Sequence, residues 1–155
     1  MQEVHTIGIA GVKVVQHPER IRTTLGSCIG VVIYDRVAKI GGMAHVILPS
    51  SAEGRGDRGK FADTAVDWLL EDALSAGCNK ERLAAKLAGG ASMFGPTTDN
   101  GLGERNAAAV KERLKHHAIR IVAEDIGGQK GRKILLDPGT GEVEVQIIGA
   151  KPTVI

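Results

Sequence analysis

Aromatic side chains are scarce in this sequence. Its 155 residues include two phenylalanines, one tyrosine and one tryptophan. Proteins that hold single-stranded nucleic acid stack its bases on exposed aromatic rings, and this chain has few to offer. Neither sign of charge predominates, since 20 basic and 18 acidic residues give a formal net charge of +2. Both features argue against nucleic acid or an anionic membrane surface as a partner.

Long hydrophobic runs are also missing. The unbroken apolar stretches are a handful of residues long, whereas a helix that crosses a bilayer needs about 20. The first residues, MQEVHTIGIAG, lack the basic and apolar regions of a secretory signal, so we predict a cytoplasmic protein without membrane insertion. Its two cysteines, Cys28 and Cys78, are then expected to stay reduced. Cysteines and histidines do not have the clustered spacing of a zinc site.

Glycine, by contrast, is abundant. It supplies 21 of the 155 residues, about twice its usual share of roughly 7%. This predicts many tight turns and close backbone approaches. The length and the 43% hydrophobic content suit one globular domain, which we expect to span residues 1–155.

Hydrophobic patterning predicts an α+β fold. Apolar residues recur at helical spacing in residues 61–76 and 104–117. Strands are predicted at residues 4–15, 29–34, 39–48, 83–94 and 118–126, with a hairpin within 133–148 and a polar, glycine-rich loop at 50–60. With many strands against two helices, we expect packed mixed β-sheets, sandwich-like, with the two main helices on the outside.

Cys28 and His45 are the candidate catalytic residues. Cys28 lies where a small-residue segment enters the buried strand 29–34, and His45 lies within the predicted strand 39–48. If these strands pair, the imidazole can reach the thiol, and a Cys–His pair is the minimal activated nucleophile. The structural alternative is a small buried cysteine and a core histidine whose nitrogens are satisfied.

A third residue normally orients the histidine of such a pair. Thr23 and Thr24 are both available, and neighbours on a strand point to opposite sides, so only one can accept from the second nitrogen of His45. Asp35 is excluded, because the intervening strand places it about 20 Å from Cys28. Cys78 follows Gly77 at the end of a predicted helix and is expected to be structural.

Six ordered blocks resemble the chemoreceptor glutamine deamidase family, CheD, over nearly the whole chain. They are Leu25-Gly26-Ser27-Cys28, residues 42–49 (GMAHVILP), residues 60–65 (KFADTA), residues 89–94 (GGASMF), Gly103-x-Arg105-Asn106 and residues 125–132 (DIGGQKGR). The resemblance implies a Cys-His-Thr catalytic triad, which would be Cys28, His45 and, by our preference over Thr24, Thr23. It also implies an α+β fold similar to the catalytic domain of the cytotoxic necrotizing factor toxins.

The function implied is deamidation of specific glutamines on methyl-accepting chemotaxis receptors. The Cys28 thiolate would attack the carboxamide, ammonia would leave, and water would hydrolyse the thioester to glutamate, without a metal or organic cofactor. Methylesterase activity on glutamate methyl esters is an expected side reaction. The resemblance also implies receptor cytoplasmic domains as substrates and a CheC-type chemotaxis phosphatase as a partner.

Two other classes of function compete with this one. The first is a non-catalytic chemotaxis regulator that binds receptors or a CheC-type phosphatase. The second is a different cysteine hydrolase, with transglutaminase-like or peptidase activity. An activated nucleophile would be expected to alkylate at a pH well below the ordinary thiol pKa of about 8.5.

Overall fold

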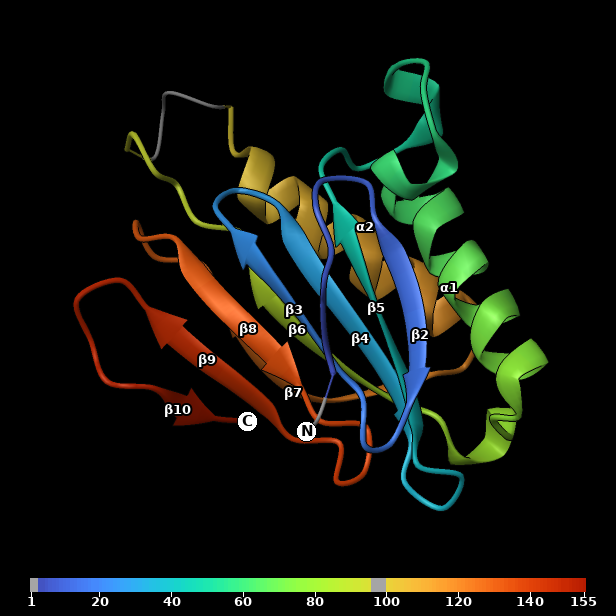
Figure 1. Ribbon diagram of the computed structural model, residues 1–155. Helices are drawn as coiled ribbons and strands as arrows, with labels where there is room; N and C mark the ends of the chain where they lie inside the picture. The colour runs from blue at the N-terminus through green and yellow to red at the C-terminus, as the bar shows by residue number, and fades with distance from the viewer. Residues whose placement is uncertain (1–2, 96–99) are drawn as a thin grey trace.

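The computed structural model describes residues 3–95 and 100–155, and its strands form two five-stranded β-sheets (Figure 1). The first sheet has the order β1 (Val4–Thr6), β3 (Arg20–Leu25), β8 (Arg132–Leu136), β9 (Val143–Ile147) and β10 (Thr153–Val154). The second has the order β2 (Val12–Gln16), β5 (Ile40–Val46), β4 (Ile29–Asp35), β6 (Ala84–Gly89) and β7 (Arg120–Ile126). Both sheets are mixed, because β1 runs parallel to β3 and β6 runs parallel to β7, while the other pairs are antiparallel. The α+β class is therefore confirmed.

The two main helices, α1 (Ala62–Ala76) and α2 (Leu102–His116), pack on one face of the second sheet. The other face of that sheet packs on the first sheet, so the layers run sheet, sheet, helices (Figure 1). Three short 3₁₀ turns complete the described elements: η1 (Ser51–Glu53), η2 (Arg58–Lys60) and η3 (Lys80–Arg82). Among the residues described, no helix has the length and apolar content to cross a membrane.

Strand β4 is buried along its whole length because it lies in the middle layer. Ile29, Val31 and Ile33 belong to the core on the helix side, while Val32 and Tyr34 belong to the core between the sheets. A strand covered on both faces needs a continuous apolar run rather than an alternating one. This explains why residues 29–34 could be predicted as a buried strand.

Residues 4–15, predicted as one or two short strands, form two, β1 and β2, which belong to different sheets. Two other predicted segments differ from the structure in detail. The strand predicted for residues 83–94 ends at Gly89, where Gly89 and Gly90 take φ values of 107° and 68° that turn the chain out of the sheet. The loop at residues 50–60 contains the turns η1 and η2, capped by Ser50 and Asp57.

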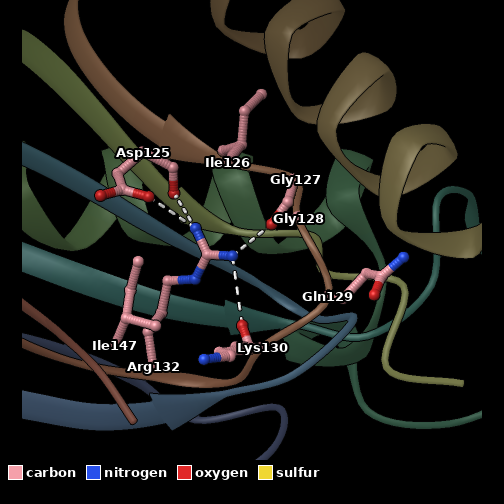
Figure 2. A pocket seen from close by; sticks show the side chains of 8 residues that line it. All are labelled: Asp125, Ile126, Gly127, Gly128, Gln129, Lys130, Arg132 and Ile147. Atoms are coloured by element: carbon pink, nitrogen blue, oxygen red, sulfur yellow. Dashed lines mark hydrogen bonds and ion pairs between the residues drawn. The ribbon is translucent and has the colours of Figure 1, made fainter. Parts of the chain in front are cut away.

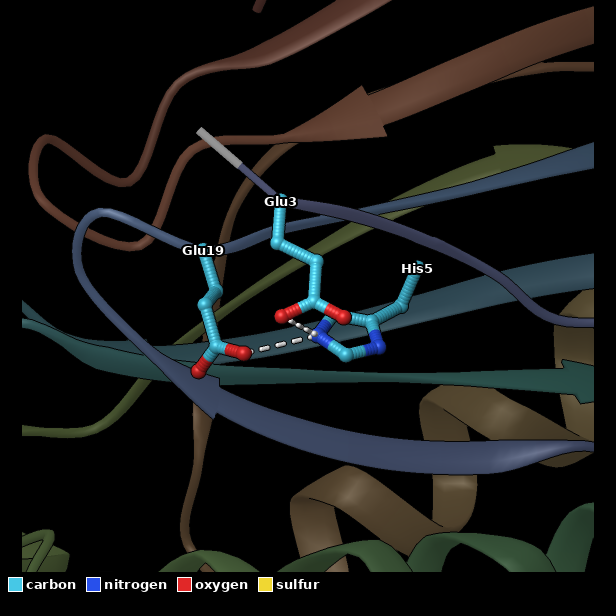
Figure 3. A group of neighbouring side chains, drawn as sticks. All are labelled: Glu3, His5 and Glu19. Carbon is cyan, nitrogen blue, oxygen red and sulfur yellow. Dashed lines mark hydrogen bonds and ion pairs between the residues drawn. The ribbon is translucent and has the colours of Figure 1, made fainter. Parts of the chain in front are cut away.

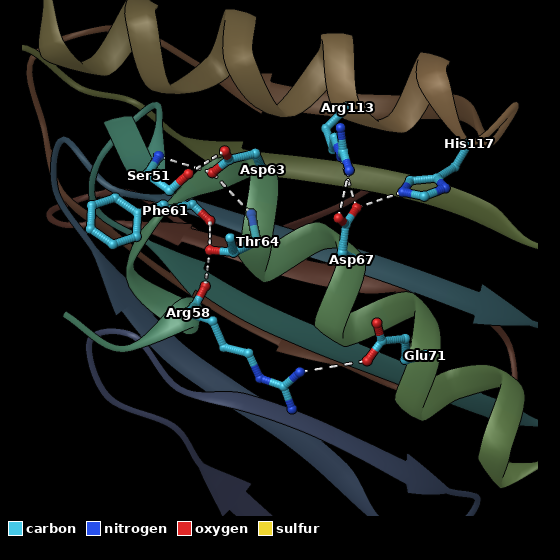
Figure 4. A network of polar contacts seen from close by, with 9 residues as sticks. All are labelled: Ser51, Arg58, Phe61, Asp63, Thr64, Asp67, Glu71, Arg113 and His117. Atoms are coloured by element: carbon cyan, nitrogen blue, oxygen red, sulfur yellow. Dashed lines mark hydrogen bonds and ion pairs between the residues drawn. The ribbon is translucent and has the colours of Figure 1, made fainter. Parts of the chain in front are cut away.

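A polar network joins the two helices (Figure 4). The Asp67 carboxylate of α1 accepts hydrogen bonds from Arg113 Nε at 2.7 Å and Arg113 Nη2 at 2.6 Å, and it lies 2.6 Å from His117 Nε2. The hydrogen bonds from Arg113 hold the pKa of Asp67 below its ordinary value. One turn further along α1, Glu71 pairs with Arg58 at 3.5 Å on the exposed surface.

The Asp67 network gives a testable stability prediction. Asp67→Asn keeps the shape but removes the charge, and we expect it to lower the free energy of unfolding by about 1 kcal/mol at pH 7 in urea titrations. Because the folded-state pKa is depressed, the difference between the two proteins is full above the unfolded pKa of Asp67. It should shrink as the pH falls below about 4.

Glu71→Gln is the matched control for this prediction. Its exposed ion pair should contribute little, so we expect almost no change in unfolding free energy at either pH. Equal losses from Asp67→Asn and Glu71→Gln, or a difference that persists unchanged at pH 3, would contradict the role assigned to the Asp67 network.

Candidate active site

His45 and Thr23 meet in the layer between the two sheets. Along β3 the side chains of Ile21, Thr23 and Leu25 are buried, while Thr24 points outward and is exposed. Thr23 Oγ1 lies 2.8 Å from Nδ1 of His45, which projects from β5. The two side chains are 2% and 3% exposed. Of the two threonines between which the sequence left a choice, Thr23 is the one that contacts His45.

A second hydrogen bond of Thr23 fixes the tautomer of His45. The Thr23 hydroxyl donates its one hydrogen to the carbonyl oxygen of Ile7 at 2.8 Å. The hydroxyl can then only accept from His45, so Nδ1 of the imidazole must carry a hydrogen. In the neutral ring this leaves Nε2 without a hydrogen and able to act as a base. The Ile7 carbonyl was missed by sequence reasoning, since a backbone group leaves no signal in residue identity.

The N-terminal strand β1, which directly precedes Ile7, is held by polar contacts at the surface (Figure 3). His5 Nε2 lies 2.9 Å from the Glu19 carboxylate and 3.8 Å from that of Glu3. The hydrogen bond with His5 lowers the pKa of Glu19. The ligand atoms of these three residues lie within 4.8 Å of one another, the spacing of a possible metal site. Ion pairing between the histidine and its two carboxylates accounts for this arrangement without a metal.

Cys28 lies between β3 and β4, at the edge of the core between the sheets. Gly30 pairs with His45, and Ile29 with Val46 is the last pair of the β4–β5 ladder. Cys28 therefore lies diagonally across from His45, and Cα atoms in that relation are about 7–8 Å apart. No hydrogen bond joins the thiol to the imidazole in the described part of the chain. The structure thus brings the three predicted residues to one place without closing the Cys28–His45 contact.

Burial shifts the pKa values of both residues toward the neutral forms. It raises the pKa of the Cys28 thiol, an effect partly offset by the amide N–H of Cys28. It also lowers the pKa of His45. Burial of the thiol therefore works against alkylation at an unusually low pH, the behaviour expected of an activated Cys28, which stays a prediction.

Two glycine-rich segments, residues 89–92 and 127–131, support the Cys28 loop, which comprises residues 26–28 between β3 and β4. The amide of Gly90 donates to the Cys28 carbonyl at 2.8 Å, and the amide of Ala91 donates to the Gly26 carbonyl at 3.0 Å. Only glycine fits at position 89, because a Cβ there would collide with the Cys28 carbonyl oxygen. The Ser92 amide in turn donates to the Gly128 carbonyl at 2.8 Å, which ties this segment to the loop before β8.

The side chain of Arg132 supports the loop at residues 127–131 through hydrogen bonds to its backbone (Figure 2). Its guanidinium, 3% exposed, donates to the Asp125 carboxylate at 2.6 Å and to the carbonyl oxygens of Gly127 and Lys130. The same residues line a pocket of about 440 Å³. Since the Asp125 carboxylate and backbone oxygens occupy both terminal nitrogens of the guanidinium, this glycine-rich loop is a turn supported from the core rather than an anion cradle.

Asp35 and Cys78 lie together at the opposite end of β4. Asp35 accepts hydrogen bonds from Arg82, which hold its pKa well below the ordinary value despite burial. The Cys78 thiol points at the Ile40 carbonyl, 3.8 Å away, and burial raises its pKa to about 11. Neither residue approaches His45.

Asn106 is a further residue of the site that sequence reasoning did not single out for a role. It projects from α2, is fully buried, and its Nδ2 donates to the carbonyl oxygens of Ser27 at 3.2 Å and Ile47 at 3.1 Å. A signal was available, because Asn106 precedes Val110 and Leu114 at four-residue spacing on the buried face of α2. A polar residue on such an apolar stripe needs partners.

Comparisons with known proteins agree with one another. The family model described as CheD chemotactic sensory transduction matches residues 47–147. The chemoreceptor glutamine deamidase CheD of Halalkalibacterium halodurans is 44% identical over 155 residues, covering 96% of each chain. The probable chemoreceptor glutamine deamidase CheD of Geobacillus kaustophilus is 48% identical over 148 residues, covering 90% of each. Among solved structures, the hypothetical protein YfiH of Bacillus licheniformis is 14% identical, with a TM-score of 0.47 over 74% of this chain and 49% of that one.

The pKa directions predict how the two cysteines react. Alkylation of Cys28 by iodoacetamide should rise with pH and reach its midpoint above the ordinary thiol pKa of about 8.5, because burial raises the pKa of this thiol. Cys78 should stay unmodified in the folded protein, because it is buried and its pKa is about 11. Peptide mass mapping over a pH series measures both, with Cys78→Ser as the control. A midpoint for Cys28 below pH 8 would show that an ion pair already exists at rest.

Proposed function

The chain belongs to the CheD family, and from this premise we propose that it deamidates specific glutamine side chains of methyl-accepting chemotaxis receptors, converting them to glutamate with release of ammonia. Two of its relatives are named as chemoreceptor glutamine deamidases. The observation that carries the proposal is the hydrogen bond from His45 to Thr23, which leaves Nε2 of the imidazole without a hydrogen and able to act as a base.

The first half of the reaction forms a thioester. Because burial favours the uncharged form of both side chains, the Cys28 proton passes to Nε2 of His45 as the sulfur attacks the carboxamide carbon. The negative charge that develops on the carboxamide oxygen needs N–H donors. The amide N–H of Cys28, which lowers the pKa of the thiol against the effect of burial, is a candidate donor. His45, now an imidazolium, gives the proton on Nε2 to the departing nitrogen, and ammonia leaves.

The second half returns the enzyme to its starting state. Nε2 of His45 takes a proton from water, and the resulting hydroxide attacks the thioester carbonyl. The carbon–sulfur bond breaks, glutamate is formed, and the thiolate recovers its proton from the imidazolium. Thr23 keeps the ring in one orientation while it acts first as base, then acid, then base again. A glutamate methyl ester, whose leaving group is better, would be hydrolysed by the same steps.

The finer parts of this proposal concern setting and partners. The substrates are receptor cytoplasmic domains, the protein works in the cytoplasm, and a CheC-type phosphatase modulates it. The likeness of the fold to the catalytic domain of the cytotoxic necrotizing factor toxins belongs to the same proposal. The competing proposal is a non-catalytic regulator that binds receptors or such a phosphatase, and it predicts no change in receptor mass.

Mass spectrometry of a receptor cytoplasmic fragment tests the activity. Each converted glutamine should gain about one mass unit, and Cys28→Ala and His45→Ala should each abolish the gain without unfolding the protein. Because the two residues act as one unit, the double variant should be no worse than the worse single one. A double variant that loses much more activity would contradict a shared mechanism, and an unmodified receptor would favour the non-catalytic regulator.

The contact between Thr23 and His45 predicts a graded effect on kcat. Thr23→Ala removes the acceptor for Nδ1, so the ring loses its preferred tautomer and orientation. We expect kcat to fall roughly 10- to 1000-fold, or about 1.4–4 kcal/mol of transition-state stabilisation. Thr23→Ser keeps the hydroxyl and should retain most activity.

Thr24→Ala is the matched control, since Thr24 is the exposed neighbour on the same strand. Its kcat should be close to that of the wild type. An unchanged kcat in Thr23→Ala would instead mean that the hydroxyl does not orient the catalytic imidazole.

A further inference from the structure

Asn106 joins the two segments that carry Cys28 and His45. It reaches them from α2, on the helix side of the second sheet, and its side chain is fully buried. Its single NH₂ group donates one hydrogen bond to the carbonyl of Ser27, directly before Cys28, and one to the carbonyl of Ile47, two residues after His45. Both donors of the amide are therefore used on the candidate active site.

The β-ladder between β4 and β5 ends just before Ser27 and Ile47 would pair. Its last pair is Ile29 with Val46, and beyond it the amide of Ile47 donates to the Lys60 carbonyl at 3.0 Å instead of continuing the ladder. The carbonyls of Ser27 and Ile47 are thus left as two acceptors, which repel each other unless a donor lies between them. The two hydrogens of Asn106 Nδ2 supply that donor pair, which a hydroxyl or an apolar side chain does not.

The Ser27 carbonyl and the Cys28 amide belong to one planar trans peptide, so they point in opposite directions. When Asn106 holds the carbonyl toward α2, the N–H of Cys28 is turned away from the helix layer and toward the other face of the sheet. That is the face on which His45 meets Thr23. The same N–H lowers the pKa of the Cys28 thiol, against the effect of burial.

We propose that Asn106 is a positioning residue that fixes the Ser27–Cys28 peptide so that the Cys28 N–H faces the developing oxyanion. This inference rests on the deamidase function proposed above, and it names the group that sets up its oxyanion donor. Asn106 does not touch the substrate. It acts through one peptide plane, and a misplaced donor at that position costs catalysis even where the thiol and imidazole remain intact.

The test compares Asn106→Leu with Val110→Ala. The leucine keeps the volume but removes both donors. Val110, one turn further along α2, is also fully buried, and its apolar side chain cannot hydrogen-bond to the Ser27–Cys28 peptide, so its truncation perturbs the same helix without removing a donor. For Asn106→Leu we expect kcat on a receptor fragment to fall about 100-fold with KM unchanged. For Val110→Ala we expect kcat to stay within about two-fold.

Alkylation of Cys28 by iodoacetamide supplies a second readout that needs no receptor. Because alkylation forms no oxyanion, its rate at a pH where the thiol is fully ionised should be the same in Asn106→Leu and in the wild type. The thiol pKa should be higher in Asn106→Leu, since the N–H that stabilises the thiolate has turned away, and unchanged in Val110→Ala. Equal thiol pKa values in all three proteins, or equal losses of kcat in both variants, would overturn the proposal.

Asn106→Ser keeps the test decisive if the leucine variant does not fold. Its hydroxyl can donate to one of the two carbonyls, so kcat and thiol pKa should lie between the wild-type values and those of a protein without donors. Wild-type kcat and wild-type thiol pKa in a folded Asn106→Ser would overturn the role of the amide.

If the wild type does not deamidate receptor fragments, the proposed function fails. The comparison of thiol pKa values still decides whether Asn106 orients the Ser27–Cys28 peptide.

Discussion

The hydrogen bond between Thr23 and His45 is the contact on which the rest of the site depends. It links β3 of one sheet to β5 of the other, so it can form only when the two sheets pack face to face in the observed register. Its direction is set by a second hydrogen bond, from Thr23 to the carbonyl of Ile7. Ile7 directly follows β1, which pairs in parallel with β3. The tautomer of one imidazole is therefore determined by the placement of the N-terminal strand.

Burying the imidazole beside a threonine rather than a carboxylate has an electrostatic consequence. A carboxylate would stabilise the imidazolium, whereas the Thr23 hydroxyl is neutral and desolvation lowers the pKa of His45. The Cys28 thiol, also partly buried, has a raised pKa. Burial thus favours the uncharged form of both side chains. Such a site protects its thiol from adventitious alkylation and oxidation, since the thiolate is the reactive species.

The layers could be predicted from the sequence in part, and the reasons are visible in particular residues. The apolar run that begins at Ile29 predicted a buried strand, and the helical spacing of apolar residues in 61–76 predicted α1. The pairing of β4 with β5 brought Cys28 and His45 to one end of the sheet, as expected. Thr23 and Thr24 could not be separated, because the inward face of β3 is set by its packing on the second sheet. The direction of the Cys28 pKa shift could not be predicted, because burial of the thiol is a tertiary property.

The high glycine content of the sequence is related to the geometry of the candidate site. Gly30 pairs with His45, and a Cβ at Gly30 would come within 2.6 Å of Ile134 Cδ1, so a side chain there would force Ile134 of the first sheet to shift. On the other side of β4, Gly89 lets β6 approach the Cys28 carbonyl. The abundance of glycine is thus explained in part by the geometry of the candidate site. Thr23, His45 and Asn106 come from three different layers, and the sheets and loops must approach closely for these side chains to gather around the Cys28 loop.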